Sequence, residues 1–200
     1  MSNVEQSGSR WEVTLAILRC LNANLQQQAD AESDRVADRL GELQGTAYVG
    51  DGELARIPDV IDITVKMDPH ATKIPTRCPA VIIGGGGTTQ FGSAAATTGR
   101  QSFADTFIEI AIYMTARVLY QGERRILKEL ELILITGALG QAVISTLRSG
   151  GIDSVWSQQA GITVATPSEL DIEGYMTNDK EETTAAKAVL SVLVGHESRY

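Results

Sequence analysis

Aromatic residues and an excess of positive charge are what this 200-residue sequence lacks most clearly. Phe, Trp and Tyr together make up 5% of the residues, which leaves few rings for the base-stacking surface of a single-strand binder. Lys and Arg number 17 against 25 Asp and Glu, so the formal net charge is −8. This balance disfavours a broad electrostatic surface for nucleic acid or anionic lipid. The shortages exclude a generic nucleic-acid-binding module.

Cysteines and long apolar runs are also scarce. Cys20 and Cys78 show no metal-ligand spacing, and a secreted disulfide framework needs more of them. We expect two buried reduced thiols, with one bridge as the alternative. No uninterrupted apolar run approaches the roughly 18–20 residues that span a bilayer, and residues 1–10 lack the apolar stretch of a signal peptide. We therefore expect a protein of the reducing cytosol with no membrane partner.

The residues that are present are typical of a soluble globular domain. The hydrophobic fraction is 43% and the charged fraction 21%, and 200 residues can bury a core without metals or disulfides. No internal repeat or composition boundary divides the chain. We predict one domain over residues 1–200.

Two stretches have helical hydrophobic spacing. Residues 10–28 predict an amphipathic helix that begins at a capping box of Ser9 and Glu12, and residues 29–43 a second helix or its continuation. Residues 123–147 predict the other major helix. Its apolar residues lie on several sides, which indicates burial against a sheet and against a second helix or another subunit.

Strand patterns occupy the remaining apolar segments. Residues 60–67 alternate, residues 80–83 form a short apolar run, and residues 103–118 alternate over a long stretch. Two further strands are predicted, one within 155–165 and one at 188–194, with polar residues 166–185 between them. This order predicts an α+β domain with a mixed or antiparallel sheet flanked by two main helices.

The strand at 103–118 is long for its domain. Unbroken, it would extend about 50 Å at ~3.3 Å per residue, whereas a compact 200-residue body is about 40–45 Å across. Segment 84–102 is mostly Gly, Thr, Ala, Ser and Gln, which predicts a flexible loop or hairpin arm. We predict a long β-hairpin arm that reaches a neighbour, with a bulge or bend as the alternative. The candidate inter-subunit arm residues are Gly84, Gly85, Gly86, Gly87, Phe91, Phe103 and Phe107.

The glycines at 84–87 are the most enzyme-like feature. A phosphate-binding P-loop needs a Lys and a Ser or Thr after its last glycine, but Thr88, Thr89 and Gln90 follow here. Neither register completes the dinucleotide fingerprint of three spaced glycines. A nucleotide- or phosphate-binding enzyme using the Gly84–Gly87 turn remains the alternative hypothesis.

Other chemistry-bearing residues form no complete site. Asp30, Glu32 and Asp34 imitate a calcium loop, but Arg35 and Gly41 stand where it needs Gly and Glu, so we predict a helix surface. Neither histidine accompanies a nucleophile motif, and close carboxylates such as Glu129 with Glu131 are interpreted as solvated charge. We expect no enzyme, no catalytic or metal site and no cofactor. The histidines are His70 and His196, and the other carboxylate pair is Asp59 with Asp62.

One small basic cluster stands at the start of the second predicted helix. It contains Arg124, Arg125 and Lys128, and it could pair with acids of another subunit or keep that helix end soluble. The candidate interface helix residues are Arg124, Arg125, Leu132, Ile135 and Leu139.

The order of these segments resembles the tail terminator and tail-completion (neck) proteins of long-tailed bacteriophages. The resemblance is carried by the helix at 10–28, the strand of sequence Cys78-Pro79-Ala80-Val81-Ile82-Ile83 and the low-complexity loop after it. The long strand at 103–118, the helix at 123–147 and the strand at 188–194 complete it. It is a likeness of pattern and element order rather than of a diagnostic motif.

The resemblance implies a structural virion protein without a catalytic centre. Such a protein would form a homo-oligomeric, hexameric ring that caps the tail tube and joins it to the head connector. It would be assembled in the host cytoplasm and reside in the neck of the virion, with DNA only as passing cargo. The net charge of −8 fits this role, because an acidic lumen would repel DNA phosphates. A different connector or tube subunit of the virion is a further alternative.

Overall fold

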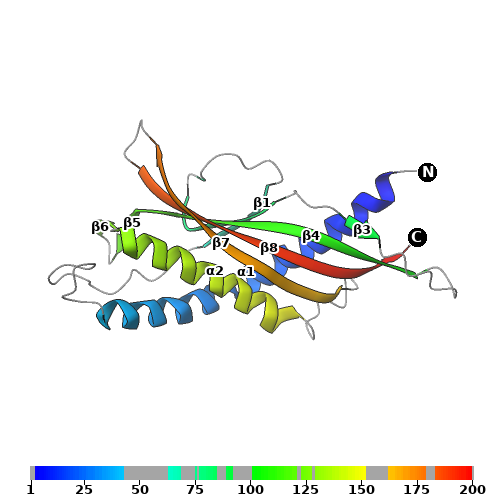
Figure 1. Ribbon diagram of the computed structural model, residues 1–200, viewed down its shortest axis with the longest axis horizontal. Coiled ribbons are helices and arrows are strands. Elements are labelled where there is room, and N and C mark those ends of the chain that lie inside the picture. The colour runs from blue at the N-terminus through cyan, green and yellow to red at the C-terminus, as the bar shows by residue number, and fades with distance from the viewer. Residues whose placement is uncertain are drawn as a thin grey trace.

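The computed structural model places two helices against one long, twisted sheet, which is an α+β fold (Figure 1). The structure describes residues 3–42, 63–68, 75, 77–84, 89–91, 101–120, 123–127, 129–151, 162–178 and 183–199. The helices are α1 (Asn3–Glu42) and α2 (Glu129–Gly151). The strands are β1 (Thr64–Met67), β2 (Ala80–Ile83), β3 (Thr89–Phe91), β4 (Gln101–Thr115), β5 (Arg117–Tyr120), β6 (Glu123–Ile126), β7 (Ile162–Asn178) and β8 (Thr183–Arg199).

Helix α1 is one continuous helix of 40 residues. The predicted helix at 10–28 is confirmed, and residues 29–42 continue it rather than forming a separate helix. The predicted capping box is wrong, because Ser9 and Glu12 lie well inside the helix instead of at its start. The buried side chains recur at helical spacing and face the sheet and α2. They are Val13, Ala16, Ile17, Cys20, Leu21, Leu25 and Ala29.

Helix α2 begins six residues later than predicted, at Glu129. Residues 123–126 form β6 instead, which pairs with β5 in a separate two-stranded sheet. The long alternating strand ends at Thr115, and β5 begins after a bend at Ala116. The amide of Leu127 donates a 2.7 Å hydrogen bond to the carbonyl of Ala116 and closes the base of this ribbon. Residues 123–126 therefore form a paired strand, although their spacing continues the helical pattern of the residues that follow.

The main sheet has six strands in the order β1-β2-β4-β8-β7, with β3 paired to β4 beside β2. Strands β1 and β2 are parallel, and the other pairs are antiparallel. The predicted mixed sheet is therefore confirmed. Strands β1 and β7 are its two edges.

Strands β4, β7 and β8 give the sheet its length. Strand β4 has 15 residues, all paired with β8, and β7 and β8 have 17 each. Residues 166–178 and 183–185, which the sequence marks only as polar, are strand. Pairing with β8 supplies the hydrogen bonds of β7 despite its polar sequence. Its register shifts at three places, one of them next to Pro167.

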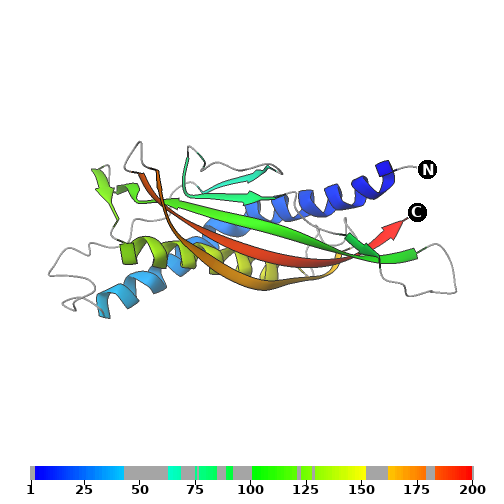
Figure 2. The same cartoon turned by 45° about the horizontal axis from the view of Figure 1, so that its top comes forward.

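Both helices lie on the same face of the sheet (Figure 2). Alternate residues of β2, β4 and β8 point toward them, so one large core contains side chains from all five elements. Helix α2 contacts α1 on one side and β4, β7 and β8 on another. This confirms the predicted burial of α2 on several sides. Of the two predicted partners for its second side, a helix or another subunit, the structure shows a helix, α1. The strand contribution is Val81, Ile83, Ile108, Ile110, Ile112, Met114, Ala116, Ala186, Ala188, Leu190, Val192 and Val194.

The opposite face of the sheet has a much smaller cluster. It consists of Ile82, Ala111 and Tyr113, with Cys78 packed against them. The intervening residues of β8 on this face, Val189 among them, are half-buried. We call this side the open face.

Candidate interaction surfaces

Acidic and metal-ligating side chains form no metal centre among the described residues, in which no group of three or more His, Cys, Asp and Glu comes together. Asp30, Glu32 and Asp34 lie on α1, so the predicted helix surface is confirmed and a calcium loop is excluded there. Glu131 corrects another expectation, because it is 3% exposed and has interaction partners within the protein rather than being solvated. Residues 59, 62 and 70 lie outside the described residues.

The two cysteines are free, as the sequence predicts, but the predicted burial is confirmed for Cys20 alone. Cys20 is buried in the main core, where its Sγ lies 3.8 Å from the Thr146 carbonyl of α2. Cys78 is half-buried beside the open-face cluster. Burial raises the pKa of each thiol from 9.0 to about 11. Both therefore stay protonated at neutral pH, which leaves neither as an activated nucleophile.

Gly84, the first glycine of the enzyme-like turn, belongs to the sheet. Its amide donates a 2.7 Å hydrogen bond to the carbonyl of Glu109 on β4. A Cβ at this position would lie 3.2 Å from the same oxygen, so glycine permits the close approach. An amide already bonded to a carbonyl is not available to a phosphate. Gly85, Gly86 and Gly87 lie outside the described residues.

The predicted interface helix is divided between two places. Leu132, Ile135 and Leu139 are at most 2% exposed and pack in the core of their own chain, so they offer no surface to a second subunit. This corrects the prediction, because α1 and the sheet cover the sides of α2 that the sequence left unassigned. Arg124 and Arg125 lie on β6 rather than on the helix, and the Arg124 side chain is exposed.

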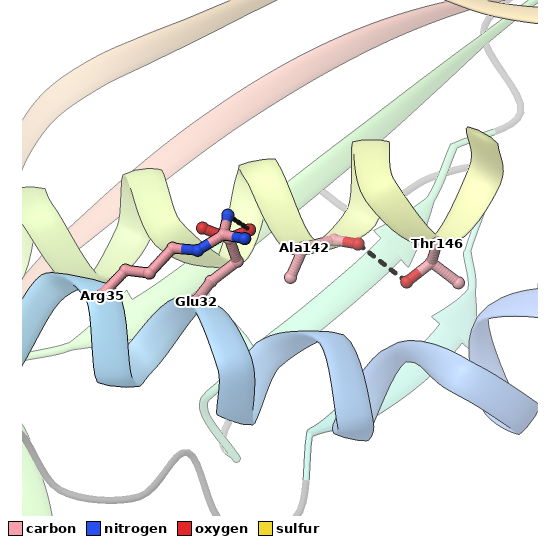
Figure 3. Close-up of polar contacts among 4 residues, drawn as sticks. All are labelled: Glu32, Arg35, Ala142 and Thr146. Carbon is pink, nitrogen blue, oxygen red and sulfur yellow. Dashed lines mark hydrogen bonds and ion pairs between the residues drawn. The ribbon is translucent and has the colours of Figure 1, made fainter. Parts of the chain in front are cut away.

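The polar contacts where α1 and α2 run side by side are structural (Figure 3). The Thr146 hydroxyl donates a 2.7 Å hydrogen bond to the Ala142 carbonyl one turn earlier, which satisfies a buried hydroxyl inside α2. On α1, Arg35 forms a 2.6 Å ion pair with Glu32. Three further acids of this half of α1, Asp30, Asp34 and Asp38, are exposed and spaced four residues apart. Such spacing places them on one stripe of the helix.

Phe107 is the arm residue for which the structure gives a surface. It is 37% exposed on the open face, at a register position directly opposite Leu193 of β8. Phe91 and Phe103 lie on β3 and β4, which pair next to each other in this part of the sheet. The paired ends of β4 and β8 extend beyond the end of α2 (Figure 1). Phe107 is therefore an apolar position on the face of this strand pair that points away from both helices, since its neighbour Ile108 is buried in the core on the helix side.

The second exposed large hydrophobic residue among those described is Ile126, at 71% exposure. It falls within the helix predicted at residues 123–147, and the structure places it on β6 instead. It shares a face of the β5–β6 ribbon with Arg124 and Arg117, both exposed. The signal that could have revealed it is the pair of arginines directly before it, which is unfavourable for a buried helix start.

Helix α2 also contains the one candidate membrane span found in the described residues. The window Glu131–Arg148 has a mean hydropathy of 1.2, and 56% of it is buried within the protein. Contacts with α1 and three strands account for that apolar composition. The helix serves as a core helix in this fold.

The function of this chain has to be inferred from its exposed surfaces. No protein-family model matches the chain, and no curated protein matches it. The two exposed apolar positions, Phe107 and Ile126, and the charges beside them are the features that a functional argument has to explain.

Proposed function

We propose that this chain is a structural virion protein of a tailed bacteriophage, a ring-forming tail terminator at the neck that joins the tail tube to the head connector. The single observation that carries the proposal is the β4–β8 strand pair, which extends past α2 and presents Phe107 on its open face. The order of helices and strands, which resembles that family, supports the same function.

A ring requires a surface that meets a different surface on the next copy. Such head-to-tail contacts close into a ring when their rotation is a fraction of a full turn. The extended strand pair supplies a candidate for one of the two surfaces, because Phe107 and Leu193 stand opposite each other on the face of the sheet that carries no helix. Removing apolar side chains of this kind from water favours association, and part of that gain offsets the translational and rotational freedom that is lost when two copies assemble.

The charge of the chain supports a role beside DNA. The net charge of −8 leaves the protein with an overall negative field. An acidic passage repels phosphates, so DNA would pass through such a ring without being held. In this proposal DNA is cargo and neither a ligand nor a substrate.

The deciding experiment is the mass and shape of the purified full-length chain. Light scattering should give a discrete oligomer, with six copies of the 21.4 kDa chain as the expected ring, and negative-stain images should show closed rings. Rings added to tail tubes should bind at tube ends. Rings that stack into long tubes would instead identify a tube subunit. A strict monomer with and without tail tubes would overturn the proposal.

A variant tests whether the open face takes part. Phe107→Ala should weaken association about tenfold or more, or about 1.4 kcal/mol, while the fold is retained, because a few large anchor residues carry most of the binding energy of an interface. Glu109→Gln is the matched control, because Glu109 is exposed two residues further along the same face of β4. Equal association of the wild type and both variants would remove the open face from the ring contact.

A further inference from the structure

The β5–β6 ribbon is the most unusual exposed element of the described structure. Arg117 pairs with Ile126 and Leu119 with Arg124, so these four positions share one face of the ribbon. Ile126 is 71% exposed and both arginines are exposed. The ribbon forms its own two-stranded sheet and adds no strand to the main sheet. A two-stranded ribbon is marginally stable by itself, so a feature that holds it in place needs to be identified.

Its base is held by the core. The Leu127 amide donates its hydrogen bond to the Ala116 carbonyl, and these two residues are 4% and 5% exposed. The ribbon therefore leaves the body from a fixed base, with its arginine-bearing face presented to solvent. Scattered single apolar residues on a surface need no explanation. An apolar side chain between two arginines on one face, however, has the composition of an interface, in which arginine is enriched and lysine is depleted.

The surface with complementary charge on this chain is the C-terminal half of α1. From Asp30 to Glu42 the sequence has five acids against two arginines, and one of those arginines is paired with Glu32. Asp30, Asp34 and Asp38 are exposed and lie on one stripe of the helix, on the side away from the core residues Leu25 and Ala29. Asp34 and Asp38, one turn apart, offer bidentate partners to arginine side chains, and Asp30 adds a third carboxylate that already accepts a 2.9 Å hydrogen bond from the Gln26 side chain.

The ribbon of one chain and the acidic stripe of the same chain are separated by α2. Both lie at the same end of the molecule, and α2 runs between them in both views (Figures 1 and 2). A contact between these surfaces therefore joins two copies of the chain.

We infer that the arginine face of the β5–β6 ribbon docks onto the Asp30–Asp34–Asp38 stripe of α1 on a second copy of this chain. Ile126 would lose its exposure to water at the centre of that contact, with the arginines on either side. Complementary charge steers two copies together and fixes their register, which matters for a chain whose net charge of −8 otherwise repels its copies. The inference goes beyond the proposed function, because a simple dimer could form through the same contact.

Charge reversal with crossed rescue tests the contact. Arg124→Glu should weaken self-association at least tenfold in sedimentation velocity at low salt, and Asp34→Lys combined with Asp38→Lys should do the same. All three positions are exposed, so the fold should persist with an unchanged melting temperature. A chain that carries the three substitutions together regains opposite charges and should associate within about threefold of the wild type.

The matched control is Arg77→Glu, which reverses an equally exposed arginine outside the ribbon. It should leave association within about twofold of wild type. Association that is lost equally in this control, or not regained in the triple variant, would overturn the inference. A wild type that stays monomeric at every concentration would overturn it as well.

A covalent trap gives an independent readout. In a Cys78→Ser background, a chain with Ile126→Cys mixed with a chain with Asp34→Cys should form mixed disulfide dimers on mild oxidation. A chain with Arg77→Cys in place of Ile126→Cys should not. Dimers trapped by this pair without rings would keep the inference and overturn the ring. Rings that are insensitive to Arg124→Glu and yield no trapped pair would keep the ring and overturn the inference.

Discussion

The two faces of the sheet differ in how much they are covered, although the same strands build both. On the helix side, alternate residues of β2, β4 and β8 join α1 and α2 in one large core. On the open face the neighbouring residues of those strands form a cluster of only three buried side chains, and Phe107 remains 37% exposed. The alternation of a strand therefore supplies both a stable core and a surface with apolar positions left for a partner.

Strand β2 shows the difference at the level of adjacent residues. Ile82 and Ile83 are both buried, at 4% and 0% exposure, but Ile83 belongs to the main core and Ile82 to the small cluster. Burial alone therefore does not distinguish the two faces. The two faces differ instead in how many side chains would surround the cavity that remains after a buried residue is truncated.

The two thiols give the largest expected contrast between the faces. Cys20 lies in the main core and Cys78 is half-buried beside the open-face cluster. We expect a thiol reagent to label Cys78 at least on the order of a thousandfold faster, because Cys20 reacts only when the domain unfolds and domains are stable by about 5 kcal/mol or more. Labelling that is quenched at a series of times and followed by mass spectrometry measures both rates. The variants Cys20→Ser and Cys78→Ser show which rate belongs to which thiol.

The pH dependence of the same reaction checks its cause. The folded pKa of both thiols is about 11 against 9.0 ordinarily, so labelling of Cys78 should accelerate about tenfold per pH unit up to that value. Between pH 9 and 11 the folded state keeps thiol protons that the unfolded chain loses, so stability should fall as pH rises through this window. Equal labelling of both cysteines at neutral pH would contradict the contrast between the faces.

Truncation of the adjacent Ile82 and Ile83 of β2 compares the two faces by the loss in free energy of unfolding. Ile83→Ala should destabilise the protein by about 4 kcal/mol and Ile82→Ala by about 2 kcal/mol, within the range of about 2–5 kcal/mol for such truncations. The larger cost is expected where α1 and the strands hold the cavity open. Urea unfolding followed by circular dichroism measures both values. If Ile82→Ala costs as much as Ile83→Ala, the open face is as tightly packed as the core.

Truncation of Phe107 on the open face of β4 should give the smallest effect on stability. Phe107→Ala should change the free energy of unfolding by about 1 kcal/mol or less, because the side chain is already 37% exposed. Ile108→Ala, one residue further and 2% exposed, is the control and should cost about 2–4 kcal/mol. A large loss for Phe107→Ala, measured in the same urea experiment, would mean that Phe107 is a core residue and not a surface for a partner.

The parts of the fold that the sequence predicted are those with a strong local period. Residues 10–28 have helical spacing and 80–83 are uniformly apolar, and each forms the predicted element. The strand predicted at 103–118 forms as far as Thr115, where the alternative of a bend takes over. The cysteines are free as expected, and the acids at 30, 32 and 34 lie on a helix. These features depend on neighbours within a few residues along the chain, which sequence reasoning can see.

The predictions that failed involve strand pairing, which overrides or is hidden by the local sequence pattern. In β7, Leu170 and Ile172 alternate with Glu169, Asp171 and Glu173, a strand signal that the surrounding polar residues concealed. Their register partners on β8, Leu190 and Ala188, are buried on the helix side of the sheet, so pairing with the next strand decides the conformation. Ile126 was misplaced because its spacing fits the helix that follows, whereas pairing with Arg117 takes it into the ribbon.

The antiparallel pairing of β4 with β8 has a mechanical consequence. All 15 residues of β4 have partners on β8, and the hydrogen bonds of an antiparallel pair run perpendicular to the strands. A pull along the axis of these strands therefore loads the whole ladder in shear, and no single bond has to yield before the others. A pull across the strands at one end would instead open the ladder one bond at a time. The long pair is thus strong in one direction and weak in the other.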